Sequence, residues 1–307
     1  MHPFFFVLML NARKNNMQTN RTYIRRNIWQ TILPNAVCYL FAVIFVCCNQ
    51  DVKNQENTSI ISSKSIVEKL SKNTNIVLKG KTISDALDFL SVNTQKFMGS
   101  VYIEPIVCFI NCTFEDNISA CTNDDKCIFS RKVVFKDCLF KKGVCFQNAE
   151  FRDDFSMDFS KIEGVAKFDG AIFRSKASFN ETNFKNNATF SNAVFCMVAS
   201  FHKSFFKNNC IFHYARFNNI AKFMESYFYG YTDFSQIFSS SILDFTAGKF
   251  SGETTMSYST LLSDVLFNNC QFKQKVKFAD NAVLGEIKLR NIAGKIPDIS
   301  SNKMFNN

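Results

Sequence analysis

Residues that could do chemistry are few in this chain, and they do not converge on one site. Of its three histidines, His2 lies at the amino end, whereas the separation of His202 and His213 is half of one full repeat. The sequence has no Gly-rich phosphate loop, no HExxH motif and no nucleophile elbow. Acidic pairs such as Asp153-Asp154 are typical of solvated turns. We therefore predict no catalytic, cofactor-binding or metal-binding residues, and a protein that is not an enzyme.

Two adjacent cysteines, Cys47 and Cys48, have a more specific setting. They close an almost uncharged apolar run that begins at Ile32 and is preceded by three arginines. Such a run is typical of a signal peptide or membrane anchor, and the positive charge predicts that the following chain lies outside the cytoplasm. The run resembles a bacterial lipoprotein leader, although Val46 stands where that leader has a small residue. Lipidation at Cys47 or Cys48 and an uncleaved membrane helix are both open.

The elements that must position any site come from a repeat of large apolar residues. From Phe129 to Leu289 such a residue recurs at alternating steps of five and six, and 23 of the 30 positions are Phe. A small residue lies two positions before most of them. Only Ser239 breaks the apolar series, and its neighbour Phe238 predicts a local adjustment of one residue. A helix is excluded, because at about 100° per residue these steps would place the two Phe series roughly 140° apart.

In extended backbone, residues i and i−2 share a face, so a small and a large side chain can enter one core while the residues between them turn the chain. The recurring Ala-x-Phe pattern resembles the pentapeptide-repeat family in its Phe-rich form. This resemblance implies an all-β fold, a right-handed quadrilateral β-helix in which each coil takes two steps of five and two of six. At about 4.8 Å between stacked strands, the repeat would form about seven coils and a rod roughly 35 Å long.

The repeat suggests a division of the chain into five parts. These are a leader or membrane anchor at 1–48 with Met17 as a candidate start, a flexible tether at 49–63, an N-terminal cap at 64–100, the β-solenoid at 101–294 and a tail at 295–307. Within the cap we expect a short helix from Ser65 to Lys72, a strand from Asn75 to Ile83, and a second short helix or degenerate coil at Ser84 to Leu90. A bulge or loop is expected where the repeat is interrupted, at Glu115 to Lys126.

The positions of the 12 cysteines argue against a disulfide framework. Five occupy the small inward position, and we predict that they are packing residues: Cys112, Cys127, Cys138, Cys210 and Cys270. Four lie elsewhere, namely Cys108, Cys121, Cys145 and Cys196. A bridge between Cys121 and the inward Cys127, across the interruption, is left open. No CxxC pair occurs, so the sequence gives no support for a zinc site.

Side chains that are separated by one full coil should lie on the same wall of the solenoid. Phe205 and Tyr227 have this spacing at outward positions, as do Lys207 and Tyr229, and Tyr231 lies at the adjoining corner. We predict that these five residues form a patch that binds a protein partner. The alternative interpretation is an ordinary ladder of contacts on a β-surface.

The formal net charge of +10 lies mostly outside the repeat, because residues 101–294 hold 22 basic and 20 acidic residues. A nearly neutral rod lacks the negative surface of the family members that mimic DNA, and it gives no reason to expect nucleic acid as a ligand. We therefore predict a non-enzymatic, membrane-tethered rod on the extracytoplasmic side of a bacterial cell envelope, with a structural or protein-binding role. The alternative is a cytoplasmic protein of the DNA-mimic type that interacts with DNA gyrase or topoisomerase.

Overall fold

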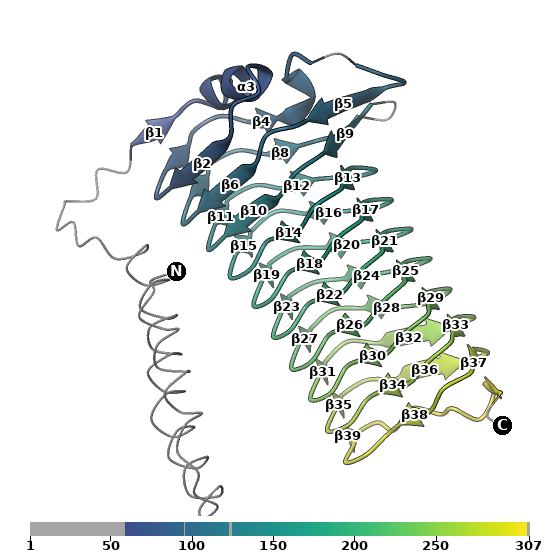
Figure 1. Ribbon diagram of the computed structural model, residues 1–307. Helices are drawn as coiled ribbons and strands as arrows, with labels where there is room; N and C mark the ends of the chain where they lie inside the picture. Colours follow the sequence, from purple (N-terminus) through teal and green to yellow (C-terminus); the bar gives the residue numbers. More distant parts are fainter. Residues whose placement is uncertain (1–58, 95, 123–124, 306–307) are drawn as a thin grey trace, which may run out of the picture. The chain divides into compact units, whose positions relative to one another are not determined.

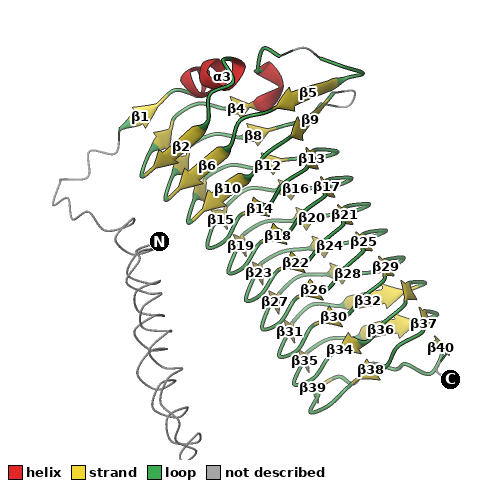
Figure 2. Cartoon of the chain, viewed as in Figure 1, coloured by secondary structure: helices red, strands yellow, loops and turns green. Residues whose placement is uncertain are grey.

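The chain coils into four parallel β-sheets that form the sides of a solenoid (Figure 1). The computed structural model describes residues 59–94, 96–122 and 125–305. We call the four sheets A, B, C and D, and successive strands along the chain belong to sheets A, C, D and B in turn. Most strands pair with the strands one regular coil before and after them, as Ala188 pairs with Cys210. Short strands alternate with corner turns, and the one α-helix of these residues lies at the amino-terminal end (Figure 2). The predicted four-sided parallel β-solenoid is thus confirmed.

The strands are mostly two residues long. Sheet A contains β1 (Ile60–Ile61), β3 (Thr82–Ile83), β7 (Thr113–Phe114), β11 (Leu139–Phe140), β15 (Lys161–Ile162), β19 (Asn183–Phe184), β23 (Phe205–Phe206), β27 (Tyr227–Phe228), β31 (Lys249–Phe250), β35 (Gln271–Phe272) and β39 (Ala293–Gly294). Sheet B contains β2 (Ile76–Lys79), β6 (Val107–Ile110), β10 (Val133–Lys136), β14 (Phe155–Ser156), β18 (Ala177–Ser178), β22 (Ala199–Ser200), β26 (Ala221–Lys222), β30 (Leu243–Asp244), β34 (Val265–Leu266) and β38 (Ile287–Lys288). Sheet C contains β4 (Leu87–Asp88), β8 (Ile118–Ser119), β12 (Val144–Cys145), β16 (Ala166–Lys167), β20 (Ala188–Thr189), β24 (Cys210–Ile211), β28 (Thr232–Asp233), β32 (Thr254–Ser257) and β36 (Val276–Ala279). Sheet D contains β5 (Ser100–Ile103), β9 (Lys126–Phe129), β13 (Glu150–Phe151), β17 (Ile172–Phe173), β21 (Val194–Phe195), β25 (Arg216–Phe217), β29 (Phe238–Ser239), β33 (Thr260–Leu261), β37 (Ala282–Val283) and β40 (Lys303–Met304).

The steps of five and six correspond to two kinds of corner. Non-glycine residues with φ near +55° recur twice in each coil, at the corners of the five-residue steps, for example at Asn148 and Phe159. At one such corner the N–H of Ala149 donates to the carbonyl of Phe146 at 3.2 Å, with Asn148 in the third position of the turn. This is the arrangement of a type II β-turn, which requires a positive φ there. The six-residue steps turn through wider bends instead.

The interior is filled by columns of phenylalanine rings. Within a column the rings stack, as Phe179, Phe201 and Phe223 do at centroid distances of 4.8 Å. Between sheets B and C the rings meet edge to face, and Phe201 lies 5.3 Å from both Phe190 and Phe212. Stacked and edge-to-face pairs are the arrangements that the ring quadrupole favours. Large and small side chains on a shared face therefore produce a continuous core.

The solenoid extends beyond the range that the repeat suggested. The expected single strand at Asn75 to Ile83 is two strands in different sheets, β2 and β3, because the chain turns at Gly80 with φ of +61°. The following segment forms a degenerate coil that consists of β4 and the 3₁₀-helix η1 (Phe89–Ser91). The solenoid therefore has about 11 turns, as the 11 strands of sheet A indicate, instead of seven.

A short helix, α3 (Ser63–Ser71), packs on these first coils and begins earlier than expected. Ser62 is its N-cap, and the Ser62 side chain accepts a hydrogen bond from the N–H of Lys64. The Asp85 carboxylate accepts hydrogen bonds from the N–H of Ser63 at 2.9 Å and from its hydroxyl at 2.7 Å. The buried Ile66 and Leu70 face the core, so the helix covers apolar side chains at the end of the solenoid.

Two early coils carry insertions, which explains why the repeat is hard to see before Phe129. Both are visible in the register, because Ile76 pairs with Val107 and Ile118 pairs with Val144, and each of these separations is longer than a regular coil. In the coil that carries the second insertion, Ala120 stands where the next coil has Phe146. The ring of Phe89 fills the resulting space and lies 5.2 Å from Phe129 and 6.4 Å from Phe146.

The predicted adjustment at Ser239 is wrong. Ser239 pairs with Phe217 in unbroken register, is 1% exposed and occupies the inward position, while Phe238 pairs with Arg216. The larger Ile237, also 1% exposed, stands at the preceding small position. A large and a small residue have thus exchanged places within one face, and the core volume is kept without a register shift.

The carboxyl-terminal end adds a strand where a tail is expected. β40 pairs with β37 of sheet D, and the N–H of Lys303 donates to the carbonyl of Asn281 at 2.9 Å. In sheet A the last inward position is Gly294, with φ of +85°, and a Cβ there would clash with the carbonyl oxygen of Phe272. Glycine lets the backbone approach this closely.

Candidate binding surface on sheet A

Three outward rings on sheet A form a continuous stack. Phe205 on β23 and Tyr227 on β27 are register neighbours, and their centroids are 4.9 Å apart with planes 12° from parallel. Tyr229 follows β27 and stacks on Tyr227 at 6.3 Å. Tyr229 is 42% exposed, and the other two rings are half-buried. The structure thus brings together the aromatic residues that the coil spacing predicted, and it holds them on a strand ladder.

Two lysines lie over these rings. The Nζ of Lys207 is 3.9 Å from the Tyr229 ring centroid and 5.6 Å from that of Phe205. The Nζ of Lys249 is 4.7 Å from the Tyr227 centroid and donates to its hydroxyl at 3.1 Å. Each cation is held by the negative face of a ring. Lys249, on β31, is a member of this surface that the sequence analysis missed, although it lies one full coil from Tyr227 and that spacing could have revealed it.

The basic character continues along this half of the sheet. Each strand of sheet A from β19 to β39 has two outward positions, the outward residue of the strand and the residue after it. These positions hold no carboxylate, and they hold five exposed lysines: Lys185, Lys207, Lys249, Lys273 and Lys295. Nearer the amino end the lysines of sheet A are paired, as Lys141 is with Glu115 at 2.8 Å and Lys161 with Glu163 at 2.5 Å. We call the part from β19 to β39 the basic aromatic wall. Its charge is not neutralised within the wall.

Tyr231 contributes to a neighbouring surface rather than to the stack. It is 40% exposed at the corner between sheets A and C and lines a shallow depression with Glu253, Lys275 and Lys277. Partial burial, followed by the charges of Asp233 and Glu253, raises the pKa of the Tyr231 hydroxyl above its usual value. The hydroxyl therefore stays protonated and available as a donor at neutral pH.

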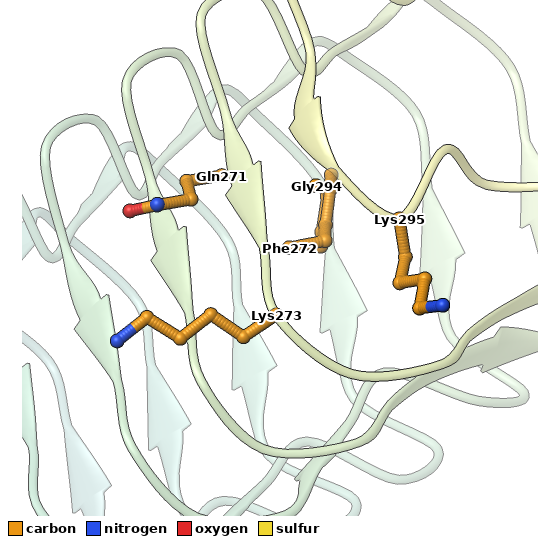
Figure 3. Close-up of a pocket in the computed structure, with 5 residues that line it drawn as sticks. All are labelled: Gln271, Phe272, Lys273, Gly294 and Lys295. Carbon is orange, nitrogen blue, oxygen red and sulfur yellow. The ribbon is translucent and has the colours of Figure 1, made fainter.

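A second shallow depression lies at the carboxyl-terminal end of the basic aromatic wall (Figure 3). It is lined by Gln271, Phe272, Lys273, Gly294 and Lys295, and the side chains of Gln271 and both lysines extend from its rim in the figure. The depression thus adds polar donors to the wall and no nucleophile or acid–base pair.

The two histidines of the solenoid have separate partners. His202 precedes the corner from sheet B to sheet A, with its Nε2 3.9 Å from a Glu225 oxygen. His213 lies at the corner from sheet C to sheet D, with its Nδ1 3.2 Å from the Ser235 hydroxyl and 3.6 Å from an Asp233 oxygen. These are opposite corners of the coil, as the spacing predicted. Within the part of 59–305 that the structure describes, no group of three or more His, Cys, Asp or Glu side chains is arranged to hold a metal ion.

The five cysteines expected at inward positions are buried, and the other four are half-buried. Several inward thiols and hydroxyls are directed at a backbone carbonyl of the preceding coil. Cys138 Sγ lies 3.5 Å from the Phe109 oxygen, and the Ser204 hydroxyl donates to Phe179 at 2.6 Å. Because a buried polar group needs a partner, Ser and Cys are suited to these positions. The predicted packing role of these cysteines is confirmed.

Two further predictions have different outcomes. Cys121 and Cys127 are both free thiols, and the sulfur of Cys121 lies 2.8 Å from that of Cys145. The predicted leader, with Cys47 and Cys48, lies outside the described residues. Within those that are described, no helix is both long enough and apolar enough to cross a membrane.

The chain matches no family model, no curated protein and no solved structure. The fold and its surface define the class, which is a four-sided parallel β-solenoid with a large stack of buried Phe rings.

Proposed function

We propose that this protein is a non-enzymatic interaction rod whose basic aromatic wall binds an acidic segment of a protein partner. The observation that carries the proposal is the stack of Phe205, Tyr227 and Tyr229, set among lysines on a wall without carboxylates. Rigid aromatic rings lose little conformational entropy on binding and are typical anchors of interfaces. The lysine donors would pair with partner carboxylates, and Tyr231 would add a hydroxyl donor at the edge.

The proposal also includes a membrane tether and membership of a protein family. The apolar run from Ile32 to Cys48, with basic residues before it, supports an anchor that leaves the solenoid outside the cytoplasm of a bacterial cell. The tether is either a lipid on Cys47 or Cys48 or an uncleaved helix. The Ala-x-Phe spacing and the four-sided coil support membership of the pentapeptide-repeat family, with the right-handed winding that this family implies.

The binding proposal is tested with two matched sets of variants. The full chain is used to capture proteins from a solubilised envelope fraction, and each captured protein is identified by mass spectrometry and then purified for titration. Lys207→Glu and Tyr229→Ala are compared with Arg216→Glu and Phe238→Ala, because Arg216 lies 4.8 Å over the Phe238 ring on sheet D and offers the same chemistry on another wall.

The expected result is that the two sheet A variants weaken binding by about tenfold or more, whereas the sheet D variants do not. Binding should also weaken as the salt concentration rises. A captured protein that binds all four variants equally well would show that sheet A is not the interface, and the binding proposal would fail.

The tether is tested separately in a bacterial host with labelled palmitate, followed by fractionation and protease treatment of spheroplasts. Lipidation predicts label that is lost when Cys47 or Cys48 is replaced by Ser, with a protease-accessible solenoid. Membrane-bound protein without label would indicate the uncleaved helix. Soluble, unlabelled and protected protein that binds DNA gyrase in a salt-sensitive manner would favour the DNA-mimic alternative instead.

A further inference from the structure

The insertion after β8 folds into a small hairpin at the corner between sheets C and D. The N–H of Cys127 donates to the carbonyl of Ala120 at 3.0 Å, and Cys121 pairs with Lys126 in an antiparallel bridge. The N–H of Thr122 closes the hairpin through a bond to Asp125 at 2.9 Å. Sheets C and D keep their register on either side of the insertion, where β8 pairs with β12 and β9 with β13.

The base of this hairpin lies against the following coil at a pair of thiols. β8 and β12 are register neighbours, with Ser119 beside Cys145, and the N–H of Ala120 donates to the Cys145 carbonyl at 2.9 Å. The Sγ atoms of Cys121 and Cys145 are 2.8 Å apart. Both residues are half-buried, so the pair is held by hydrogen-bonded backbones and is still reachable from solvent.

We propose that Cys121 and Cys145 form a disulfide that ties the hairpin to the next coil when the chain meets a disulfide oxidant. A disulfide needs a separation of about 2.05 Å between sulfurs, and here the two sulfurs already touch, so a small side-chain rotation suffices. The cross-link would close a loop that spans one whole irregular coil.

The electrostatic setting distinguishes the two thiols. Contact with Cys121, aided by the Lys167 cation, lowers the pKa of Cys145 to about 6, and the same contact and partial burial raise the pKa of Cys121. Cys145 is therefore the thiolate that attacks first. The charges that face it are Lys167, which favours the thiolate, and Asp169, which opposes it.

The reaction balances as two thiol–disulfide exchanges. The Cys145 thiolate attacks one sulfur of the oxidant, whose S–S bond breaks and releases one thiolate. Cys121 then loses its proton and attacks the Cys145 sulfur of the mixed disulfide, which releases the second thiolate. The protein loses two thiol protons and two electrons, and the oxidant is reduced to two thiols.

A neighbouring pair of cysteines shows why the oxidant should react at Cys121 and Cys145 only. Cys112 and Cys138 lie at successive inward positions, but both are buried, and their sulfurs are directed at the carbonyls of Ile110 and Lys136 at 3.4 Å. An oxidant cannot reach them without opening the core. Cys127 is likewise enclosed, at 0% exposure.

The test uses the full chain, incubated folded with oxidised glutathione, then alkylated under denaturing conditions and digested with trypsin without reduction. Cleavage after Lys142 and Arg152 releases Cys145 as the single cysteine of its peptide, and cleavage after Lys126 separates Cys127 from Cys121. We expect a linked pair of peptides that carry Cys121 and Cys145 and that separate on reduction. Fragmentation of the linked pair should show that the other cysteines of the Cys121 peptide are alkylated.

Cys121→Ser and Cys145→Ser should abolish the linked pair, whereas Cys196→Ser, at another half-buried cysteine, should retain it. Circular dichroism checks that each variant folds, and the native chain alone decides the matter if one does not. Two separately alkylated peptides after oxidation of the native chain, or a link to Cys127, would overturn the proposal.

Discussion

Replacing Phe201 by alanine tests whether the phenylalanine columns hold the solenoid together. The side chain is fully buried, stacks on Phe179 and Phe223 at 4.8 Å, and meets Phe190 and Phe212 edge to face at 5.3 Å. Removal of a buried Phe costs about 3–5 kcal/mol, and aromatic pairs add roughly 0.5–1.5 kcal/mol beyond burial. Two longer ring contacts, with Phe195 at 6.0 Å and Phe206 at 6.3 Å, are lost as well. Because these six ring contacts disappear and the flanking coils restrain collapse of the cavity, we expect a loss near the upper limit, about 5 kcal/mol.

The matched control is Phe205→Ala, on the next strand, whose ring points outward. Its ring stacks mainly on Tyr227 at 4.9 Å, so the expected loss is that of one aromatic pair, about 0.5–1.5 kcal/mol. Both variants are measured by urea unfolding followed by far-ultraviolet circular dichroism, with amide exchange to locate the affected coils. Equal losses for the two variants, or a loss below about 1 kcal/mol for Phe201→Ala, would refute the view that the ring columns dominate stability.

Three further predictions concern the ends and the pH response. Gly294→Ala should open the last coil, because its Cβ would clash with Phe272, and amide exchange should quicken at 282–305 while the central coils are unchanged. Hydrogen bonds from Lys288 and from a backbone N–H lower the pKa of Asp264, so its contribution to stability is present above the unfolded pKa of about 3.9 and is lost as the pH falls through the folded value. In the Asp264→Asn variant, the thermal unfolding midpoint should depend less steeply on pH in that acidic range. An unchanged dependence on pH would contradict the assignment. Asp85→Ala should loosen helix α3, with faster exchange at Ser63–Ser71, and unaltered protection there would show that the Asp85 hydrogen bonds do not hold the helix.

The regular part of the fold could be predicted from spacing alone because its geometry is periodic. Steps of five and six place every large side chain inward, and residues separated by one full coil become register neighbours, as Phe205 and Tyr227 are. The same arithmetic predicted the aromatic stack and the separation of the two histidines. The set of lysines that lie without a neighbouring carboxylate could be identified only from the sheet assignments, because Lys249 lies on its strand whereas the other four lysines follow theirs.

The irregular coils could not be predicted, because a small side chain at one inward position is compensated by a large side chain elsewhere in the core. Ala120 interrupts the Phe series, and the ring that fills its place is Phe89, on a different coil. Ser239 likewise looked like a slip, whereas Ile237 restores the volume within the same face. The contact between Cys121 and Cys145 likewise joins two coils, through the pairing of β8 with β12. The spacing of residues predicts the regular coils well, but it does not predict which side chains fill the core where the repeat is interrupted.

The uniform core and the varied walls have different consequences for function. Because nearly every coil uses the same inward residues, the core supplies stiffness and fixes the spacing of the outward side chains. Any binding specificity must then come from the outward side chains of the walls. On sheet A, successive coils present Phe205, Tyr227 and Lys249 in one column and Lys207 and Tyr229 in the next. A partner that recognises this wall would read side chains at a spacing of about 4.8 Å, the distance between stacked strands. The carboxylates of an acidic segment that runs along the wall would then meet lysines of several coils at once.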